Sequence, residues 1–207
     1  MFKEILNHIF KKTVKYANEN RLVVLFFSVF CIGVTFGAFL LPSLFNADFN
    51  LPLLFERFIA LRSNGFSFIL LNSLITYGFP LILLYCFGLF AYGYVPCFLL
   101  MFVQGITHGI VCGYTYTTYG LRGAAFVLLI VMPSALLITV IYLIGSKTSF
   151  QFSVLLSKIF FCDTVLVQPS VHFKRYHYKY LILTAFAIVA ALTDSLLSRI
   201  FLGVFGF

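Results

Sequence analysis

The chain has 207 residues, of which 62% are hydrophobic and 10% charged, with a formal net charge of +8 and a mean hydropathy of +1.06. Soluble domains carry about 25% charged residues, so this composition excludes a soluble enzyme or a soluble nucleic-acid-binding domain. Residues 22–45 and 123–145 contain no acidic or basic side chain, and about 20 such residues cross a bilayer core. The chain is therefore predicted to be an integral membrane protein with membrane lipids as its surroundings.

Residues 1–21 precede the first predicted span and are expected to form a cytoplasmic amphipathic helix. Apolar residues from Phe2 to Ala17 recur at helical spacing on one face, and lysines such as Lys3 and Lys15 occupy the other. A basic amphipathic helix of this kind lies in the headgroup region of a membrane. A cap folded over the cytoplasmic helix ends is an equally good interpretation.

Five transmembrane helices are predicted, which makes the chain a single all-α domain built as a compact bundle. Their expected ranges are 22–45, 66–90, 95–116, 123–145 and 180–205. Between them, 46–65 is expected to be an outer loop with a short helix, and 117–122 a turn. Residues 146–179 are expected to be a cytoplasmic basic segment, in which 150–161 is too short to cross the membrane and is predicted to lie at its surface.

Lysine and arginine placement predicts the orientation of the bundle. With the N-terminus inside, ten of these residues fall on the inner side and four on the outer side. Loops rich in Lys and Arg stay in the cytoplasm. We therefore expect a multi-pass protein of the cell membrane with its N-terminus inside and its C-terminus outside.

The sequence holds no pattern typical of catalysis. Paired carboxylates, a nucleophile beside a base, and a phosphate-binding loop are all missing from it. Its cysteines form no C-x-x-C pair and do not cluster with histidines at metal-ligand spacing; they are Cys31, Cys86, Cys97, Cys112 and Cys162. The prediction is a protein that is not an enzyme and that carries no cofactor or metal.

Glycines recur every four residues in two of the predicted spans. Gly105, Gly109 and Gly113 lie on one face of the third span, and Gly33 and Gly37 repeat the pattern in the first. Each interior glycine weakens a helix by about 1 kcal/mol relative to alanine, but a stripe without side chains lets another backbone approach closely. We interpret both stripes as helix-packing surfaces, with part of a transport path as the alternative.

A few polar or helix-breaking residues lie inside the spans. Asp194 is the sole acidic residue there, and such residues are costly and often functional; it is expected near the outer surface, hydrated and facing Ser198. His108, beside the glycine stripe, is expected to bond a neighbouring helix, with a pH-sensitive ligand as the alternative. Pro80 and Pro133 are expected to kink their helices.

The segment "QGITHGIVCGYTYTTYGLRGAAFVLLIVMPSALLITVIYLIGS" (104–146) resembles the stage II sporulation protein M family of bacterial membrane proteins. Members show a glycine-striped helix, a turn ending in G-x-x-G like Gly120 to Gly123, and then a helix with a central proline. The "IGVTFGAF" of the first span is similar to the family's first helix. Many relatives outside sporulation carry an H-G-x-x-E type sequence in the proline-centred helix, whereas residues 132–140 here contain neither histidine nor glutamate.

The resemblance implies a membrane scaffold for septal peptidoglycan remodelling when a mother cell engulfs the forespore. Its implied partners are the wall-degrading stage II sporulation proteins D and P, and a homo-oligomer stays open. The alternative is a small transporter or permease subunit with a polar path through Asp194 and His108. Convergence of these two side chains in one cavity between helices would favour the alternative.

Overall fold

The computed structural model describes residues 20–46, 65–162 and 169–205, and every regular element in these ranges is helical. Residues 1–19 of the predicted amphipathic helix and the interior of the predicted loop at 46–65 lie outside the described residues. In chain order the elements are α2 (Arg21–Asn46), α4 (Phe66–Gly88), α5 (Tyr94–Phe126), the π-helix η1 (Val127–Val131), α6 (Met132–Cys162) and α7 (Pro169–Phe205).

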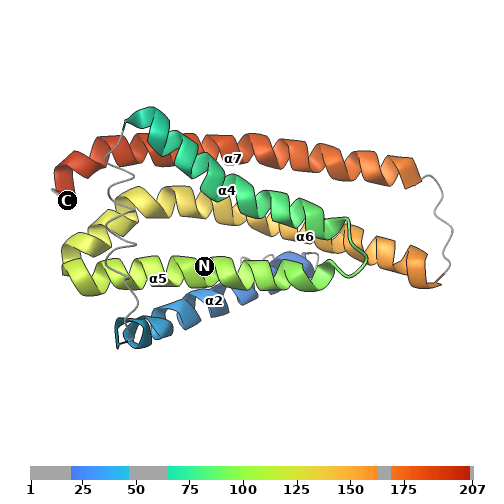
Figure 1. The fold of residues 1–207 in the computed structure, drawn as a ribbon, viewed down its shortest axis with the longest axis horizontal. Coiled ribbons are helices and arrows are strands. Elements are labelled where there is room, and N and C mark those ends of the chain that lie inside the picture. Colours follow the sequence, from blue (N-terminus) through green and yellow to red (C-terminus); the bar gives the residue numbers. More distant parts are fainter. Residues whose placement is uncertain (1–19, 47–64, 163–168, 206–207) are drawn as a thin grey trace, which may run out of the picture.

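In the described ranges, four helical stretches are long and apolar enough to cross a membrane: Arg21–Leu40, Phe66–Gly88, Tyr94–Phe160 and Val171–Ile200. The third has 67 residues, which would measure about 100 Å in one straight helix. It is not straight, because the chain turns back at Gly120 and α5 and α6 then lie alongside each other (Figure 1). The described chain is thus an all-helical bundle whose lengths and composition are consistent with a membrane protein.

Gly120 makes the reversal of the chain, within the last part of α5 and inside the predicted turn at 117–122. Its backbone has φ 57° and ψ −132°, a region that residues with a side chain enter at a cost of about 1–3 kcal/mol. A Cβ added at Gly120 would meet nothing within 4 Å, so the backbone angle alone requires glycine. At Gly123 the reason is different, because a Cβ there would come within 2.7 Å of the Thr115 carbonyl carbon.

The two prolines inside the helices have different surroundings. A proline lacks an N–H group, and its ring collides with the carbonyl group four residues earlier in an α-helix. Directly before Pro133 the chain forms η1, a wider turn of the kind that relieves such collisions. Pro80 is buried within α4, which stays helical from Phe66 to Gly88.

Two helices extend beyond their predicted limits. Residues 150–161, predicted as a separate segment at the membrane surface, continue α6 without a break. Similarly, α7 begins at Pro169, well before the predicted span at 180–205. The extensions support each other, because the rings of Phe152 and Tyr176 stack with their centroids 4.3 Å apart.

The helices α2 and α5 cross where glycines replace side chains. Four of the predicted packing residues lie at this crossing: Gly33, Gly37, Gly105 and Gly109. A Cβ added at Gly109 would lie 3.0 Å from the Val34 carbonyl carbon and 3.1 Å from the Ala38 nitrogen. The two backbones are therefore in direct contact, which is how membrane helices gain van der Waals energy. Gly113 is partly buried one turn further along α5.

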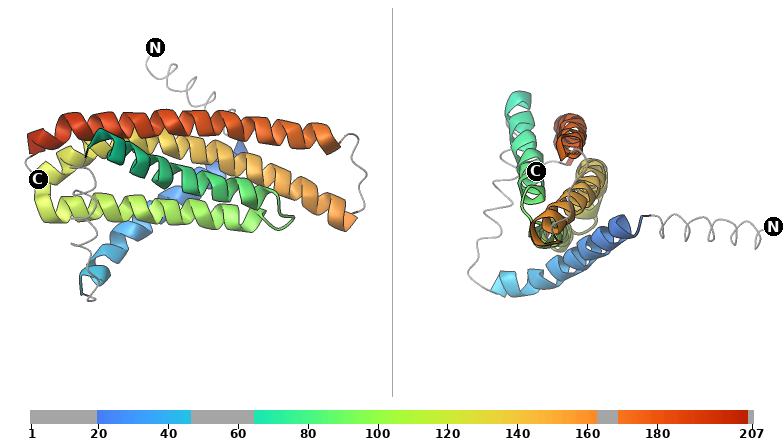
Figure 2. Two further views of the ribbon diagram at one scale, coloured as in Figure 1. Left: turned by 45° about the horizontal axis from the view of Figure 1, so that its top comes forward. Right: turned by 90° about the vertical axis from the view of Figure 1, so that its right-hand side faces the viewer.

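The remaining helices are arranged around α6. Figure 2 shows α2 crossing the bundle on one side, α4 and α7 on the opposite side, and α6 between them. Apolar residues of all five described α-helices form one core, to which α2 contributes the fully buried Phe26 and the other helices members such as Leu84 and Met101. The rest of α2 packs chiefly on α5 and leaves an apolar face exposed, for example at Phe39.

Candidate polar site within the helix bundle

Asp194 lies at the centre of a polar contact between three helices. Its Oδ2 accepts a hydrogen bond of 2.7 Å from Ser73 Oγ of α4, and its Oδ1 lies 3.1 Å from Ser134 Oγ of α6. Only 2% of Asp194 is exposed. The expectation of a hydrated Asp194 is therefore wrong, because α4 and α6 cover the carboxylate, whereas its position near the outer surface stays a prediction.

The two serines share the carboxylate unequally. Ser73 Oγ donates to Asp194 over 2.7 Å, whereas Ser134 Oγ is 3.1 Å from Asp194 and also 3.1 Å from the Val131 carbonyl oxygen of η1. A hydroxyl group has one proton to donate, so Ser134 divides its bond between two acceptors. The π-helix before Pro133 thus supplies a second acceptor beside the buried acid.

A cavity of about 250 Å³ opens beside Asp194 and is lined by residues of α4, α5, η1, α6 and α7. Nine of its thirteen lining residues carry a polar group, which distinguishes it from the apolar grooves on the outside of the bundle. His108 and Gln104 of α5 line this cavity together with Asp194. Asp194 and His108, the two residues of the polar path considered from the sequence, therefore line the same cavity.

His108 makes its hydrogen bond within its own helix. Its Nδ1 lies 2.7 Å from the Gln104 carbonyl oxygen one turn earlier, and a carbonyl oxygen only accepts, so Nδ1 carries the proton. The ring stands edge-on to Phe30 of α2, with centroids 5.6 Å apart. In place of the expected hydrogen bond to a neighbouring helix, the ring thus has a hydrogen bond within α5 and a ring contact with α2.

The arrangement can bind a proton, a cation or a small polar molecule. A carboxylate buried among apolar residues is stable only when it is hydrogen-bonded or neutralised, and Asp194 is the sole acidic residue in the described part of the chain. In those same ranges no three His, Cys, Asp or Glu side chains gather closely enough to hold a metal ion. Hydrogen-bonding and ionic chemistry are therefore what this site offers.

A second polar cluster, which sequence analysis missed, joins α4, α6 and α7 near the start of α7. Ser149 Oγ donates to the Leu84 carbonyl oxygen over 2.6 Å, and Tyr176 OH donates to the Tyr85 carbonyl oxygen over 2.7 Å. Tyr180 OH lies 3.0 Å from the Gly145 carbonyl oxygen and also contacts Ser149. The spacing of four between the two tyrosines was the available signal, because it places both hydroxyl groups on one helix face.

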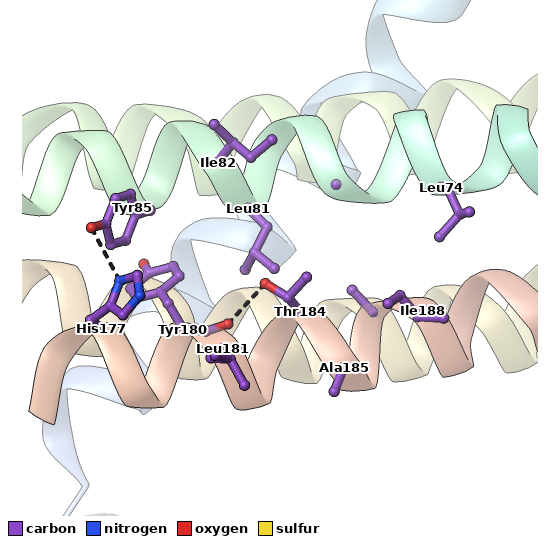
Figure 3. Close-up of a pocket in the computed structure, with 12 residues that line it drawn as sticks. Leu74, Leu81, Ile82, Tyr85, His177, Tyr180, Leu181, Thr184, Ala185 and Ile188 are labelled. Carbon is purple, nitrogen blue, oxygen red and sulfur yellow. Dashed lines mark hydrogen bonds between the residues drawn. The ribbon is translucent and has the colours of Figure 1, made fainter. Parts of the chain in front are cut away.

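Beside this cluster, an apolar groove of about 720 Å³ runs between α4 and α7 (Figure 3). Its polar end is formed by Tyr85 and His177, whose OH and Nδ1 atoms are 3.4 Å apart. From there, Leu81 and Ile188 and their neighbours continue the groove along both helices. This is an outward-facing apolar surface rather than an extension of the cavity at Asp194.

Within the described residues the chain is an all-helical bundle with helices long and apolar enough to cross a membrane, which is consistent with a membrane protein. Comparison with protein-family models, with curated proteins and with solved structures finds no match for this chain.

Proposed function

We propose that the chain is a non-enzymatic membrane scaffold of the kind that the stage II sporulation protein M family represents. In this role it recruits peptidoglycan-degrading partners, the stage II sporulation proteins D and P, and anchors them at the septal membrane during forespore engulfment. The basis is the sequence pattern at 104–146 and in the first span. The glycines of that pattern form the contact between α2 and α5.

The observation that carries this proposal is the closed hydrogen bonding of the buried acid. Both oxygens of Asp194 accept from serines, Ser73 on α4 and Ser134 on α6, so the residue ties three helices together. The adjoining cavity, at about 250 Å³, is below the roughly 300–1,000 Å³ typical of small-molecule sites. Cross-linked helices and a small cavity favour a rigid body over a moving carrier.

The exposed face of α2 is the surface that we assign to membrane-embedded partners. It carries large apolar side chains that include Phe27, Ile32 and Phe39, which are 50%, 60% and 82% exposed. Because α2 packs chiefly on α5, this face can receive the membrane anchor of another protein without disturbing the core. Membrane anchors of partner proteins and bilayer lipids compete for this exposed face of α2.

The scaffold is proposed to cross the membrane five times, with the N-terminus inside and the C-terminus outside. The reversal at Gly120 supports two crossings within Tyr94–Phe160. Lys147 bonds Asn20 at the start of α2, so the start of α2 lies beside the later half of α6. Of the eight lysines and arginines in the described residues, all but Arg122 and Arg199 lie at the start of α2, in the second half of α6 or in the first third of α7.

A small transporter or permease subunit is the second candidate, and one observation favours it. Asp194 and His108 line the same cavity, which is the arrangement that a polar path through the bundle requires. In that case the carboxylate would exchange its serine partners for a proton or a cation during transport. A transporter of this kind requires the negative charge of Asp194, whereas a scaffold does not.

Replacing Asp194 by asparagine separates the two functions. Asp194→Asn keeps the shape and one accepting oxygen and removes the charge, so a scaffold should still support engulfment and recover its partners when purified from native membranes. A pathway that depends on this acid should instead stop. Gly109→Leu, which forces α2 from α5, should fail in both assays. Normal accumulation of Asp194→Asn with complete loss of function would overturn the scaffold in favour of the transporter.

A further inference from the structure

A second, larger groove runs along the outside of the bundle between α6 and α7. It has a volume of about 920 Å³ and is lined by one stripe of residues from each helix. Its floor contains Ile141 and Leu183, which are 6% and 5% exposed, and its walls contain Val140 and Phe186, which are 54% and 58% exposed. The groove is therefore apolar, open along its side and continuous with the surface that faces lipid.

One end of this groove is basic. Lys147 of α6 and Lys179 of α7 both line it, together with the polar side chains of Thr148 and Gln151. Lys147 Nζ donates to the neutral Asn20 Oδ1 over 2.8 Å. Within the described ranges Asp194 is the sole acid, and it is bound to serines elsewhere in the bundle, so no carboxylate there neutralises the two ammonium groups.

On its α7 side the groove is about as long as one leaflet of a membrane is deep, and on its α6 side it is longer. Ten residues separate Lys179 from Val189 along α7, about 15 Å of helix, and fourteen separate Lys147 from Pro133 along α6, about 21 Å. The hydrocarbon core of a bilayer is about 30 Å thick, so one leaflet is about 15 Å deep. A chain that starts at the lysines and follows the groove would end near the bilayer midplane.

We propose that this groove binds one anionic phospholipid from the leaflet at the lysine end. The phosphate group lies between Lys147 and Lys179, with Gln151 as a further hydrogen-bonding group, and one acyl chain lies on Ile141. Basic pockets between membrane helices on the cytoplasmic side are suited to anionic headgroups, and lysine stems extend along apolar surface to place the ammonium group at the interface. The site is independent of the scaffold function.

The groove between α4 and α7 (Figure 3) provides an internal comparison. It is similar in kind, but its polar end has Tyr85 and His177, and no lysine lines it. It should accept acyl chains without selecting an anionic headgroup. The contrast between the two grooves therefore isolates the contribution of Lys147 and Lys179.

The chain contains no tryptophan, so a single introduced tryptophan reports on one groove alone. Val140→Trp places the reporter about 10 Å from Lys147 along α6, and Ala185→Trp places it at similar depth in the comparison groove. Each full-length variant is reconstituted in phosphatidylcholine vesicles, and quenching is titrated with brominated phosphatidylglycerol or brominated phosphatidylcholine. Circular dichroism confirms that each variant keeps its helix content.

At Val140→Trp, quenching by phosphatidylglycerol should need less lipid than quenching by phosphatidylcholine, by about fivefold for each lysine. Lys179→Gln should remove part of this preference, and Lys147→Gln with Lys179→Gln should remove it, while Ala185→Trp should show none. Equal quenching by both lipids at Val140→Trp would overturn the proposal. A preference that survives both lysine substitutions, or no quenching by either lipid because protein fills the groove, would also overturn it.

Discussion

Adding one methyl group at Gly109 should destabilise the bundle, although alanine is the better helix former. The new Cβ would lie 3.0 Å from the Val34 carbonyl carbon and 3.1 Å from the Ala38 nitrogen, with the Val34 oxygen closer still. These are backbone atoms, which cannot rotate away as a side chain can. Since ordinary contacts between carbon atoms are about 3.5–4.0 Å, α2 and α5 must move apart by up to about 1 Å.

The expected cost of Gly109→Ala combines two opposing terms. Forcing extra volume into a packed contact costs about 1–3 kcal/mol, and the better helix propensity of alanine returns about 1 kcal/mol. We expect a net loss of up to about 2 kcal/mol in the free energy of unfolding. Gly78→Ala is the matched control, because a Cβ at Gly78 would meet nothing within 4 Å. This variant should therefore show only the stabilisation from the better helix propensity of alanine, up to about 1 kcal/mol.

Buried Cys97 provides the assay for both variants. Its side chain is 0% exposed in the core, so with Cys97 as the only cysteine a thiol-reactive dye reports unfolding during titration with SDS in mixed micelles. The two variants should shift the midpoint in opposite directions. Shifts of equal sign and size would refute the reasoning that α2 and α5 are held by backbone contact at glycine.

Two further outcomes follow from the reversal between α5 and α6. Gly120→Ala should lower the free energy of unfolding by about 1–3 kcal/mol in the same assay, since φ is 57° there and no atom lies within 4 Å of the new Cβ; an unchanged midpoint would contradict a backbone origin. For topology, single cysteines are placed in a cysteine-free variant at Leu121 and Phe160, which are 87% and 71% exposed. A membrane-impermeant maleimide should label Leu121→Cys in intact cells and Phe160→Cys only after permeabilisation, and the reverse pattern would refute the proposed orientation.

Local pattern in the sequence was enough to predict much of the bundle. An apolar composition with 10% charged residues determines helical structure, because every backbone polar group in lipid must be satisfied within the segment. The glycine spacing of four marks packing faces, since residues four apart lie on one side of a helix. The turn at Gly120 was likewise predictable from short-range residues alone.

Only the tertiary structure decided which faces meet and what surrounds each polar group. Ser73 and Ser134 are 121 and 60 residues from Asp194 in the chain, and nothing in their local sequence marks them as its partners. Asp194 is buried because α4 and α6 cover it, and α6 extends to Cys162 because aromatic and hydroxyl contacts with α4 and α7 support it. The periodicity of the sequence determines which face of a helix carries apolar or small side chains. How deeply a residue is buried depends on packing against helices that are distant in sequence.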